Sequence, residues 1–468
     1  MKKNVLFLVA DDQRFNTVHA LGNKEIQTPN LDKLVERGTT FENAYIPGGT
    51  SGAVCMPSRA MMHTSQHLFQ LQDLGAVIPK DHAILGEELK KNGYQTIGIG
   101  KWHNGIDGYG RAFTDGGKIF FGGMWDHWNV PVNNFDPSKK YDQWKNFTYD
   151  PFSTNIKIKM PADHLDLGKH STDLFSDEII KKIHEVSGSE QPFFINGNFL
   201  APHDPRTMPE KFQNMYDPDQ IELPVNYLPE HPFDFDVKAQ RDESLEAYPR
   251  PEKAVRQHIA DYYAMISHID ERIGTIIDAL KETGQLENTL IIFTGDNGIS
   301  IGQHGLMGKQ NLYEHSIHVP LIMAGPGIPE NYRVEERALL LDIMPTILDY
   351  AGVQIPEGLF GKSLLPVIAG VEEGRKEIYL LFTDKIRGLL KENYKLIEYA
   401  TIYGRHTQLF DLMKDPKEMN NLADSEEFQP LVKEMQAELV QHAKVLGDRQ
   451  FEQGKIFWAQ KEKLESEK

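Results

Sequence analysis

The segment NVLFLVADD, residues 4–12, is a continuous apolar run that ends in two aspartates. Such a run is typical of a central strand of a parallel sheet, buried on both faces. Three later apolar segments also end in polar side chains. The four predicted strand ends carry Asp11, Asp12, Lys101, His103, His203, Asp296 and Asn297. A single strand end often runs into a polar loop, but four together predict one site, because open α/β sheets bind ligands beyond the carboxyl ends of their strands.

Amphipathic helices separate these apolar segments. The longest is expected over residues 252–282, where Tyr262, Met265, Ile269 and Ile273 form part of an apolar stripe. Strands that alternate with helices at this spacing predict an α/β fold, with a large and mostly parallel sheet sandwiched by helices.

The pattern changes after about residue 370. The segments EIYLLFTDKIRGLLKENYKLIEYA and TQLFDLMKDPKEMNNLAD look like short antiparallel strands joined by polar turns, and a helix is expected over roughly 427–446. A chain of 468 residues exceeds the size at which a single core usually stops growing. We therefore expect an N-terminal catalytic domain over 1–370. A smaller C-terminal α+β subdomain, a short antiparallel sheet plus a helix, is expected over 371–468.

The formal charge of −18 argues against nucleic acid as a partner, because a nucleic-acid binder presents a basic face. No apolar run is long enough to cross a bilayer, so no membrane partner is expected. The first residues, MKKNVLFLVADDQ, are similar to a signal peptide, but their apolar run is short and ends in aspartates. The protein is expected to be cytoplasmic if Met1 is the native start, and periplasmic or secreted if a leader was removed.

Four of the residues at the strand ends are oxygen donors. Asp11, Asp12, Asp296 and Asn297 offer carboxylate and amide oxygens without a soft ligand, which suits Ca2+ or Mg2+. Adjacent charged carboxylates would repel one another if buried, and a divalent ion resolves that conflict. The alternative is that these residues only form turns, since Asp-Asn-Gly favours a turn in any protein.

A set of basic residues could surround such an ion. It comprises Arg59, Lys101, His103, His203 and Lys309, with His304 nearby. Around a metal these side chains would form a pocket for a tetrahedral oxyanion. A histidine titrates near neutrality, so His203 could donate a proton to a departing alcohol. Four other histidines have no such companions and are expected to be structural: His63, His67, His164 and His170.

Cys55 is the only cysteine in the chain, so it cannot form an internal disulfide or a thiolate cage for a metal. A lone cysteine is more often a small buried apolar residue than a reactive one. Its surroundings, CMPSR, resemble the C-x-P-S-R signature of the type I sulfatases within the alkaline phosphatase superfamily. The segment GYQTIGIGKWH resembles the second signature of that family, and further segments occur in family order. These are TPNLDKLVERGTTFENAY, APHDP, FTGDNG, HGLMGKQNLYE, LLDIMPTILDYAG and LFDLMKDPKEMNNLAD.

One departure follows the first signature. The family commonly has Thr-Gly there, whereas Thr64 is followed by Ser65 and Gln66. The core C-x-P-S-R is intact, so the departure bears on the efficiency of modification and not on identity.

The resemblance implies that a maturation enzyme oxidises Cys55 to Cα-formylglycine, whose hydrate is the nucleophile. One hydroxyl attacks sulfur and expels the alcohol. Loss of the proton from the other hydroxyl then re-forms the aldehyde and releases sulfate. It also implies that Ca2+, or Mg2+, is held by the modified Cys55 together with Asp11, Asp12, Asp296 and Asn297.

The resemblance also implies a role for each basic residue. Arg59 steadies the diol, and Lys101 and Lys309 bind sulfate oxygens. His103 accepts the diol proton, and His203 protonates the leaving group. Asp296 helps to deprotonate the attacking hydroxyl. Weaker candidates are Ser58, His304 and Asp204.

The expected function is hydrolysis of a sulfate monoester. The resemblance implies a sulfated carbohydrate, a small molecule or an oligosaccharide, as the substrate, with an aryl sulfate or a small alkyl sulfate as the alternative. Phosphonate monoester or phosphodiester hydrolysis is the alternative within the superfamily, and the absence of an additional Asp/His metal set favours sulfate. An inactive binder of sulfated glycans is the non-enzymatic alternative.

Residues for substrate recognition are harder to assign. Trp125, His127 and Trp128, in a loop expected over the site, suit a sugar ring and equally suit ordinary packing. His304 is a further candidate for substrate binding. Arg387, Lys391 and His406, in the smaller subdomain, are expected to reach a uronate or a second sulfate.

Overall fold

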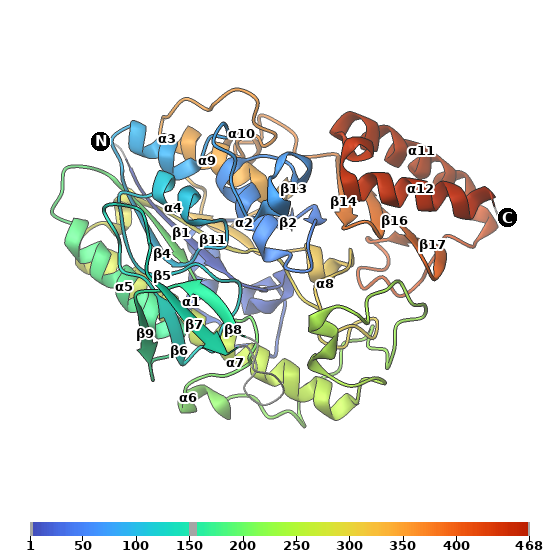
Figure 1. Ribbon diagram of the computed structural model, residues 1–468, viewed down its shortest axis with the longest axis horizontal. Helices are drawn as coiled ribbons and strands as arrows, with labels where there is room; N and C mark the ends of the chain where they lie inside the picture. Colours follow the sequence, from blue (N-terminus) through green and yellow to red (C-terminus); the bar gives the residue numbers. More distant parts are fainter. Residues whose placement is uncertain (1–2, 149–156, 467–468) are drawn as a thin grey trace.

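The computed structural model describes residues 3–148 and 157–466. Within these ranges a twisted eight-stranded sheet forms the centre of the molecule, with helices on both faces (Figure 1). Its strand order is β13 (Tyr332–Leu339), β2 (Thr39–Tyr45), β12 (Leu321–Ala324), β11 (Thr289–Gly295), β1 (Asn4–Ala10), β10 (Phe193–Asn198), β4 (Gln95–Lys101) and β5 (Asp115–Phe120). Only β12 runs antiparallel to its neighbours, β11 and β2. The predicted α/β class with a mostly parallel sheet is confirmed.

Strand β1 lies at the centre of the sheet, between β10 and β11. Its seven residues are all buried, because successive side chains point to opposite faces and both faces are covered. Val5 and Phe7 join one core cluster, and Leu6 and Leu8 join the other.

Helices with apolar stripes cover each face. The cluster of Leu6 and Leu8 is covered by α1 (Pro29–Arg37), α5 (Ser171–Val186) and α7 (Glu252–Glu282). The cluster of Val5 and Phe7 is covered by α2 (Cys55–Thr64), α3 (Leu85–Lys91), α4 (Ile106–Ala112) and α9 (Ile343–Tyr350). Helix α7 has the bounds that its sequence predicts, and its stripe residues Met265, Ile269 and Ile273 are fully buried.

The C-terminal part forms an antiparallel sheet of β14 (Glu377–Phe382), β15 (Ile386–Lys391), β16 (Tyr394–Thr401) and β17 (Gly404–Asp411). The short strand β3 (Gly48–Gly49), from the N-terminal part of the chain, pairs in parallel with β14. Helix α11 (Gln429–Leu446) occupies the predicted range, and a further helix, α12 (Glu452–Ser466), includes much of the charged tail. Two helices, where the sequence pattern indicated one, therefore pack on this sheet (Figure 1).

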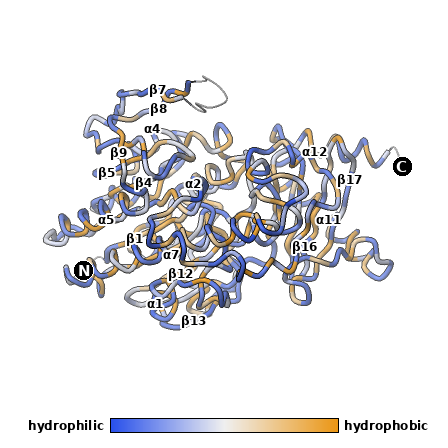
Figure 2. Tube along the Cα trace, turned by 90° about the horizontal axis from the view of Figure 1, so that it is seen from below, coloured by the Kyte–Doolittle hydropathy of each residue, from blue (hydrophilic) through white to orange (hydrophobic). Residues whose placement is uncertain are grey.

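Smaller elements complete the described chain. Two strand pairs are β6 (Asn129–Val132) with β9 (His164–Leu167), and β7 (Trp144–Thr148) with β8 (Lys157–Pro161). Figure 2 shows β7 and β8 at the periphery, beyond β4 and β5. The short helices are α6 (Glu210–Gln213), α8 (Glu314–Ile317) and α10 (Leu365–Ile368). Among the described residues, no helix combines the length and apolar character that crossing a membrane requires.

Candidate active site

The adjacent parallel strands β1 and β11 bring two acidic segments together. Ala10 is paired with Gly295, so Asp11 and Asp12 leave the sheet beside Asp296 and Asn297. The backbone N–H of Asp12 donates to Oδ1 of Asp296 at 3.0 Å. Asp12 has φ of 69°, a left-handed conformation that aspartate tolerates better than most residues. The chain therefore turns sharply where the two acidic segments meet.

Helix α2 places three side chains over these strand ends. Cys55 is its first residue, and Ser58 and Arg59 follow one turn later. The Ser58 hydroxyl donates to the backbone oxygen of Asp296 at 2.5 Å, and Arg59 Nε donates to its carboxylate at 2.8 Å. All these side chains are buried. The first turn of α2 is thus fixed to the end of β11.

Strand β4 ends in Lys101, whose Nζ contacts Oδ2 of Asp11 and lies 3.4 Å from the Cys55 sulfur. Two residues on, His103 Nδ1 lies 3.5 Å from the same sulfur. Lys309 contacts the second aspartate after β1, with its Nζ 2.6 Å from Oδ1 of Asp12. The sequence-predicted residues therefore gather around Cys55. We call them the Cys55 cluster: Asp11, Asp12, Cys55, Arg59, Lys101, His103, Asp296, Asn297 and Lys309.

His203 follows strand β10 and approaches this cluster from the side of Asp12. Its Nδ1 is 2.9 Å from the backbone oxygen of Asp204, which fixes Nδ1 as a donor. Its Nε2 is left facing Oδ2 of Asp12, at 3.7 Å. Asp204 is itself paired with Arg241.

The cluster contains polar atoms that the protein leaves unsatisfied. Asp11 Oδ1, Asp12 Oδ2 and Asn297 Oδ1 are buried oxygens without a hydrogen-bond partner among the described residues. Ligand atoms of Asp11, Cys55 and Asp296 also lie within 4.8 Å of one another. Buried oxygen acceptors are costly unless a donor or a cation satisfies them. These residues therefore fit a hard divalent cation.

Burial and neighbouring charges set the ionisation of the cluster. Burial, reinforced by the charge of Asp296, raises the pKa of Asp11 to about 6. Burial acts in the same direction on Asp296, but the charges of Arg59, Lys101 and Lys309 outweigh it and lower its pKa to about 2. Burial raises the pKa of the Cys55 thiol to about 11. The unmodified thiol is therefore protonated at neutral pH and a poor nucleophile.

The formal charges of the side chains nearly cancel. The carboxylates of Asp11, Asp12 and Asp296 are matched by the cations Arg59, Lys101 and Lys309. Burial, followed by these cations, lowers the pKa of His103 well below its usual value, so its imidazole is neutral.

Two expectations about substrate recognition are corrected. Arg387 is fully buried in the C-terminal sheet, where it forms two hydrogen bonds with the Asp448 carboxylate at 2.8 and 2.9 Å. His127 is also fully buried, and both of its ring nitrogens are engaged, by the Ser171 hydroxyl at 2.7 Å and the His203 backbone oxygen at 2.9 Å. Neither side chain is available to a substrate; His127 instead supports the segment that carries His203.

His304 does not join the Cys55 cluster either. Its ring stacks on Tyr313 and its Nε2 lies 3.2 Å from the Asn226 amide. Lys391 is paired with Glu434 and Glu438 on α11. These contacts do not support His304 as a substrate-binding residue, or Lys391 as a residue that reaches a uronate or a second sulfate.

The sequence patterns did not identify two residues of the site, Asn198 and Tyr262. Asn198, the last residue of β10, accepts a hydrogen bond from Arg59 Nη1 at 2.9 Å. Its position at the end of a strand could have identified it as a residue of the site. Tyr262, which the sequence presented as part of an apolar stripe, donates its hydroxyl to the backbone oxygen of Asp12 at 2.6 Å. No sequence pattern distinguished that hydroxyl from an ordinary core tyrosine.

Comparisons with known proteins agree with this geometry. A family model for sulfatases matches residues 3–353, and a model described as the C-terminal region of N-sulphoglucosamine sulphohydrolase matches residues 302–445. The chain is 26% identical to an N-acetylglucosamine-6-O-sulfatase of Bacteroides thetaiotaomicron, over 93% of this chain and 85% of that protein. It is 28% identical to an arylsulfatase of Clostridium perfringens, over 92% of each.

A solved structure has the same fold. It is a protein in complex with its substrate D-glucosamine-2-N,6-O-disulfate, with a TM-score of 0.71 and 24% identity, over 96% of this chain and 99% of that one. The family model covers well over half of the chain, so the resemblance found in the sequence is confirmed. The chain belongs to the sulfatase family, within the alkaline phosphatase superfamily.

Proposed function

We propose that the protein hydrolyses sulfate monoesters of a carbohydrate, with Cys55 converted to formylglycine as the nucleophilic residue. The observation that carries the proposal is the position of Cys55. It lies at the start of α2, and its sulfur is within 3.5 Å of Lys101 Nζ and His103 Nδ1. The carbohydrate sulfatases among its relatives support the substrate class.

Conversion of Cys55 to formylglycine replaces a poorly nucleophilic thiol. A buried thiol with a pKa of about 11 is not a nucleophile at neutral pH, whereas the hydrate of an aldehyde at position 55 presents hydroxyl groups at the same place. Asp11, Asp12, Asp296 and Asn297 would hold the divalent ion. When bound, that ion adds positive charge to a nearly neutral cluster and so favours an anionic ester.

The side chains of this protein then have separable tasks. Lys101 and Lys309 bind sulfate oxygens, and Arg59 holds the Asp296 carboxylate in place. His103 exchanges a proton with the hydroxyl groups at position 55, because its Nδ1 lies beside that residue. His203 protonates the departing alcohol from Nε2, the ring nitrogen that the Asp204 contact leaves available.

The modification is tested by peptide mass. Trypsin releases residues 38–59 as one peptide containing Cys55. Protein from its native host should contain this peptide with the sulfur exchanged for an aldehyde oxygen, and a Cys55→Ala variant made in parallel supplies the matched peptide without it. A peptide that carries only free thiol would favour a glycan-binding protein over an enzyme.

The substrate class is tested with a panel of sulfated mono- and disaccharides, using released sulfate as the readout. Phosphonate monoesters and phosphodiesters are assayed on the same preparation. Faster turnover of a sulfated sugar supports the proposal, and faster turnover of a phosphorus ester would replace it with the superfamily alternative. The Cys55→Ala variant should be inactive on all of them.

A further inference from the structure

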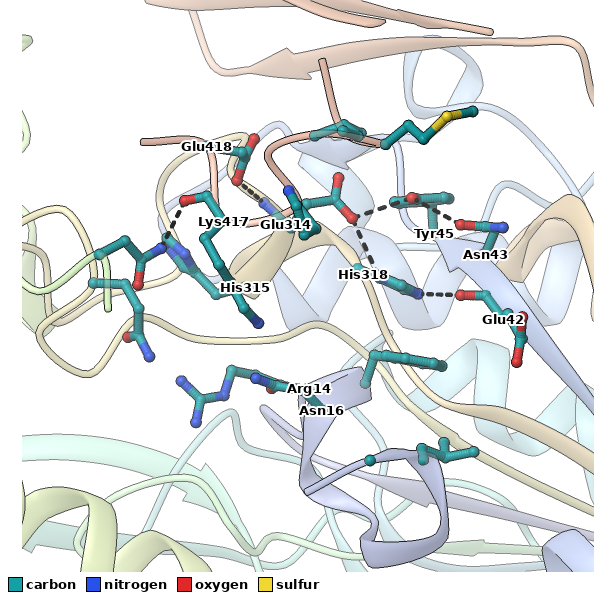
Figure 3. Close-up of a pocket in the computed structure, with 18 of the residues that line it drawn as sticks. Arg14, Asn16, Glu42, Asn43, Tyr45, Glu314, His315, His318, Lys417 and Glu418 are labelled. Atoms are coloured by element: carbon teal, nitrogen blue, oxygen red, sulfur yellow. Dashed lines mark hydrogen bonds and ion pairs between the residues drawn. The ribbon is translucent and has the colours of Figure 1, made fainter. Parts of the chain in front are cut away.

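A cavity of about 1280 Å³ lies between the large sheet and the C-terminal subdomain, away from the residues assigned above (Figure 3). Its wall includes residues that follow β1, residues of β2, the α8 segment and the loop after β17. No member of the Cys55 cluster lines it. The cavity is therefore separate from the candidate active site.

Arg14 is a buried cation at this cavity. Its backbone N–H donates to the Tyr262 hydroxyl at 3.1 Å, and its guanidinium lies over the Tyr262 ring at 5.2 Å. The residue is 2% exposed, and within residues 3–148 and 157–466 its Nε and Nη1 have no hydrogen-bond partner. A guanidinium that is removed from water needs compensating hydrogen bonds, and here several of its donors lack them.

Two further groups converge on Arg14. Figure 3 shows the Lys417 side chain extending toward Arg14, with His315 beside it. The Nε2 of His315 is buried and has no hydrogen-bond partner in the part of the chain that the structure describes. Desolvation, followed by the charge of Arg14, lowers the pKa of Lys417 against the attraction of Glu314 and Glu418.

Glu314 and Glu418 attract Lys417, but both carboxylates are paired with another cation. Glu314 is 2.8 Å from Lys395 Nζ and also pairs with His318, and Glu418 is 2.5 Å from the same lysine nitrogen. In the part of the chain that the structure describes, neither Arg14 nor Lys417 forms an ion pair. A buried arginine and a lysine at the same cavity, both without an ion pair in the described part of the chain, are unexpected at a net charge of −18.

We propose that Arg14, His315 and Lys417 form a second anion-binding site, which takes a small tetrahedral oxyanion, inorganic sulfate or phosphate. The guanidinium supplies directed N–H donors, the ammonium supplies a point charge, and a neutral imidazole supplies one N–H. An oxyanion has enough acceptor atoms to bind all three at once. The site does not depend on the proposed hydrolysis, because it shares no residue with the Cys55 cluster.

The test is calorimetric titration with sodium sulfate and, separately, sodium phosphate, at constant low chloride. It is performed in a Lys309→Gln background, which weakens anion binding at the Cys55 cluster and leaves the second site intact. Lys417 is the decisive position because it is exposed, so its replacement does not threaten folding as that of buried Arg14 does. The variants added to the background are Lys417→Gln and Lys417→Arg, with Lys444→Gln on α11 as the matched control.

We expect one bound anion in the Lys309→Gln background, unchanged by Lys444→Gln. Lys417→Gln should weaken its binding by about tenfold, as expected for loss of one charge-assisted contact, and Lys417→Arg should retain it. The sulfate and phosphate titrations identify which oxyanion binds more tightly. Equal affinity with Lys417 and with Gln at that position would overturn the site, as would the absence of binding in the background variant. Neither result bears on ester hydrolysis, which is measured separately.

Discussion

Arg59 donates from Nε to Oδ2 of Asp296 across 2.8 Å, and both side chains are buried. This pair joins the first turn of α2 to the end of β11. It therefore fixes Cys55 relative to the acidic residues, although Cys55 and Asp296 are far apart in the sequence. The remaining hydrogen bonds of the guanidinium, to the Asn198 side chain and the Lys101 backbone oxygen, extend the link to two more strands.

Removing Arg59 should destabilise the metal-free protein strongly. The Arg59→Met variant leaves the Asp296 charge buried without its partner, and such losses cost about 3–5 kcal/mol. Urea unfolding in EDTA measures the change in the free energy of unfolding. Arg37→Met removes an arginine from an exposed pair with Glu287 and should cost less than about 1 kcal/mol. Similar costs for the two variants would contradict the structural role of the pair.

Binding of a divalent cation should stabilise the fold. The unpartnered oxygens of Asp11, Asp12 and Asn297 gain a ligand, so Ca2+ or Mg2+ at 100 times its dissociation constant should add about 2.7 kcal/mol. Thermal unfolding of EDTA-treated protein, with and without each ion, measures the effect. Asp12→Asn should abolish most of it, and Asp219→Asn, an exposed residue, should not. A cation effect of the same size in Asp12→Asn would place the ion elsewhere.

The role proposed for His203 predicts a dependence on the leaving group. Without a proton donor, a sugar alcohol departs slowly, whereas nitrophenolate departs readily as an anion. His203→Ala should therefore lower kcat on a sulfated sugar by about 10²–10⁴-fold and on nitrophenyl sulfate by much less.

A control variant for His203→Ala is assayed on the same two substrates. His164→Ala, on strand β9, should leave both rates unchanged. An equal loss on the two substrates in His203→Ala would assign His203 to binding or positioning instead of proton donation.

The sequence allowed the sheet and the Cys55 cluster to be predicted because both depend on local patterns. Apolar runs such as residues 4–10 define buried strands, and parallel strands must place their carboxyl ends at one edge. Side-chain partners beyond that edge depend on packing between distant segments, which no local pattern records. Arg387 was therefore expected to reach the substrate, whereas Asp448, 61 residues away, holds it in the interior. Likewise, His127 was expected in a loop over the site that suits a sugar ring, but its ring is hydrogen-bonded to the Ser171 hydroxyl and the His203 backbone.

Acid should destabilise the protein through buried histidines, of which His67 is a clear case. Its ring packs between Phe69 and Phe360, and burial, aided by the charge of Arg375, lowers its pKa to about 3. Between pH 3 and 6.5 the unfolded chain binds a proton that the folded chain does not, so stability falls as the pH drops through this window. From pH 7 to pH 5 this residue should account for roughly 2 kcal/mol. His67→Leu should reduce the pH dependence of the free energy of unfolding by that amount, and His184→Leu, on the exposed side of α5, should not. If His67→Leu and the wild type lose equal stability between pH 7 and pH 5, the prediction is wrong.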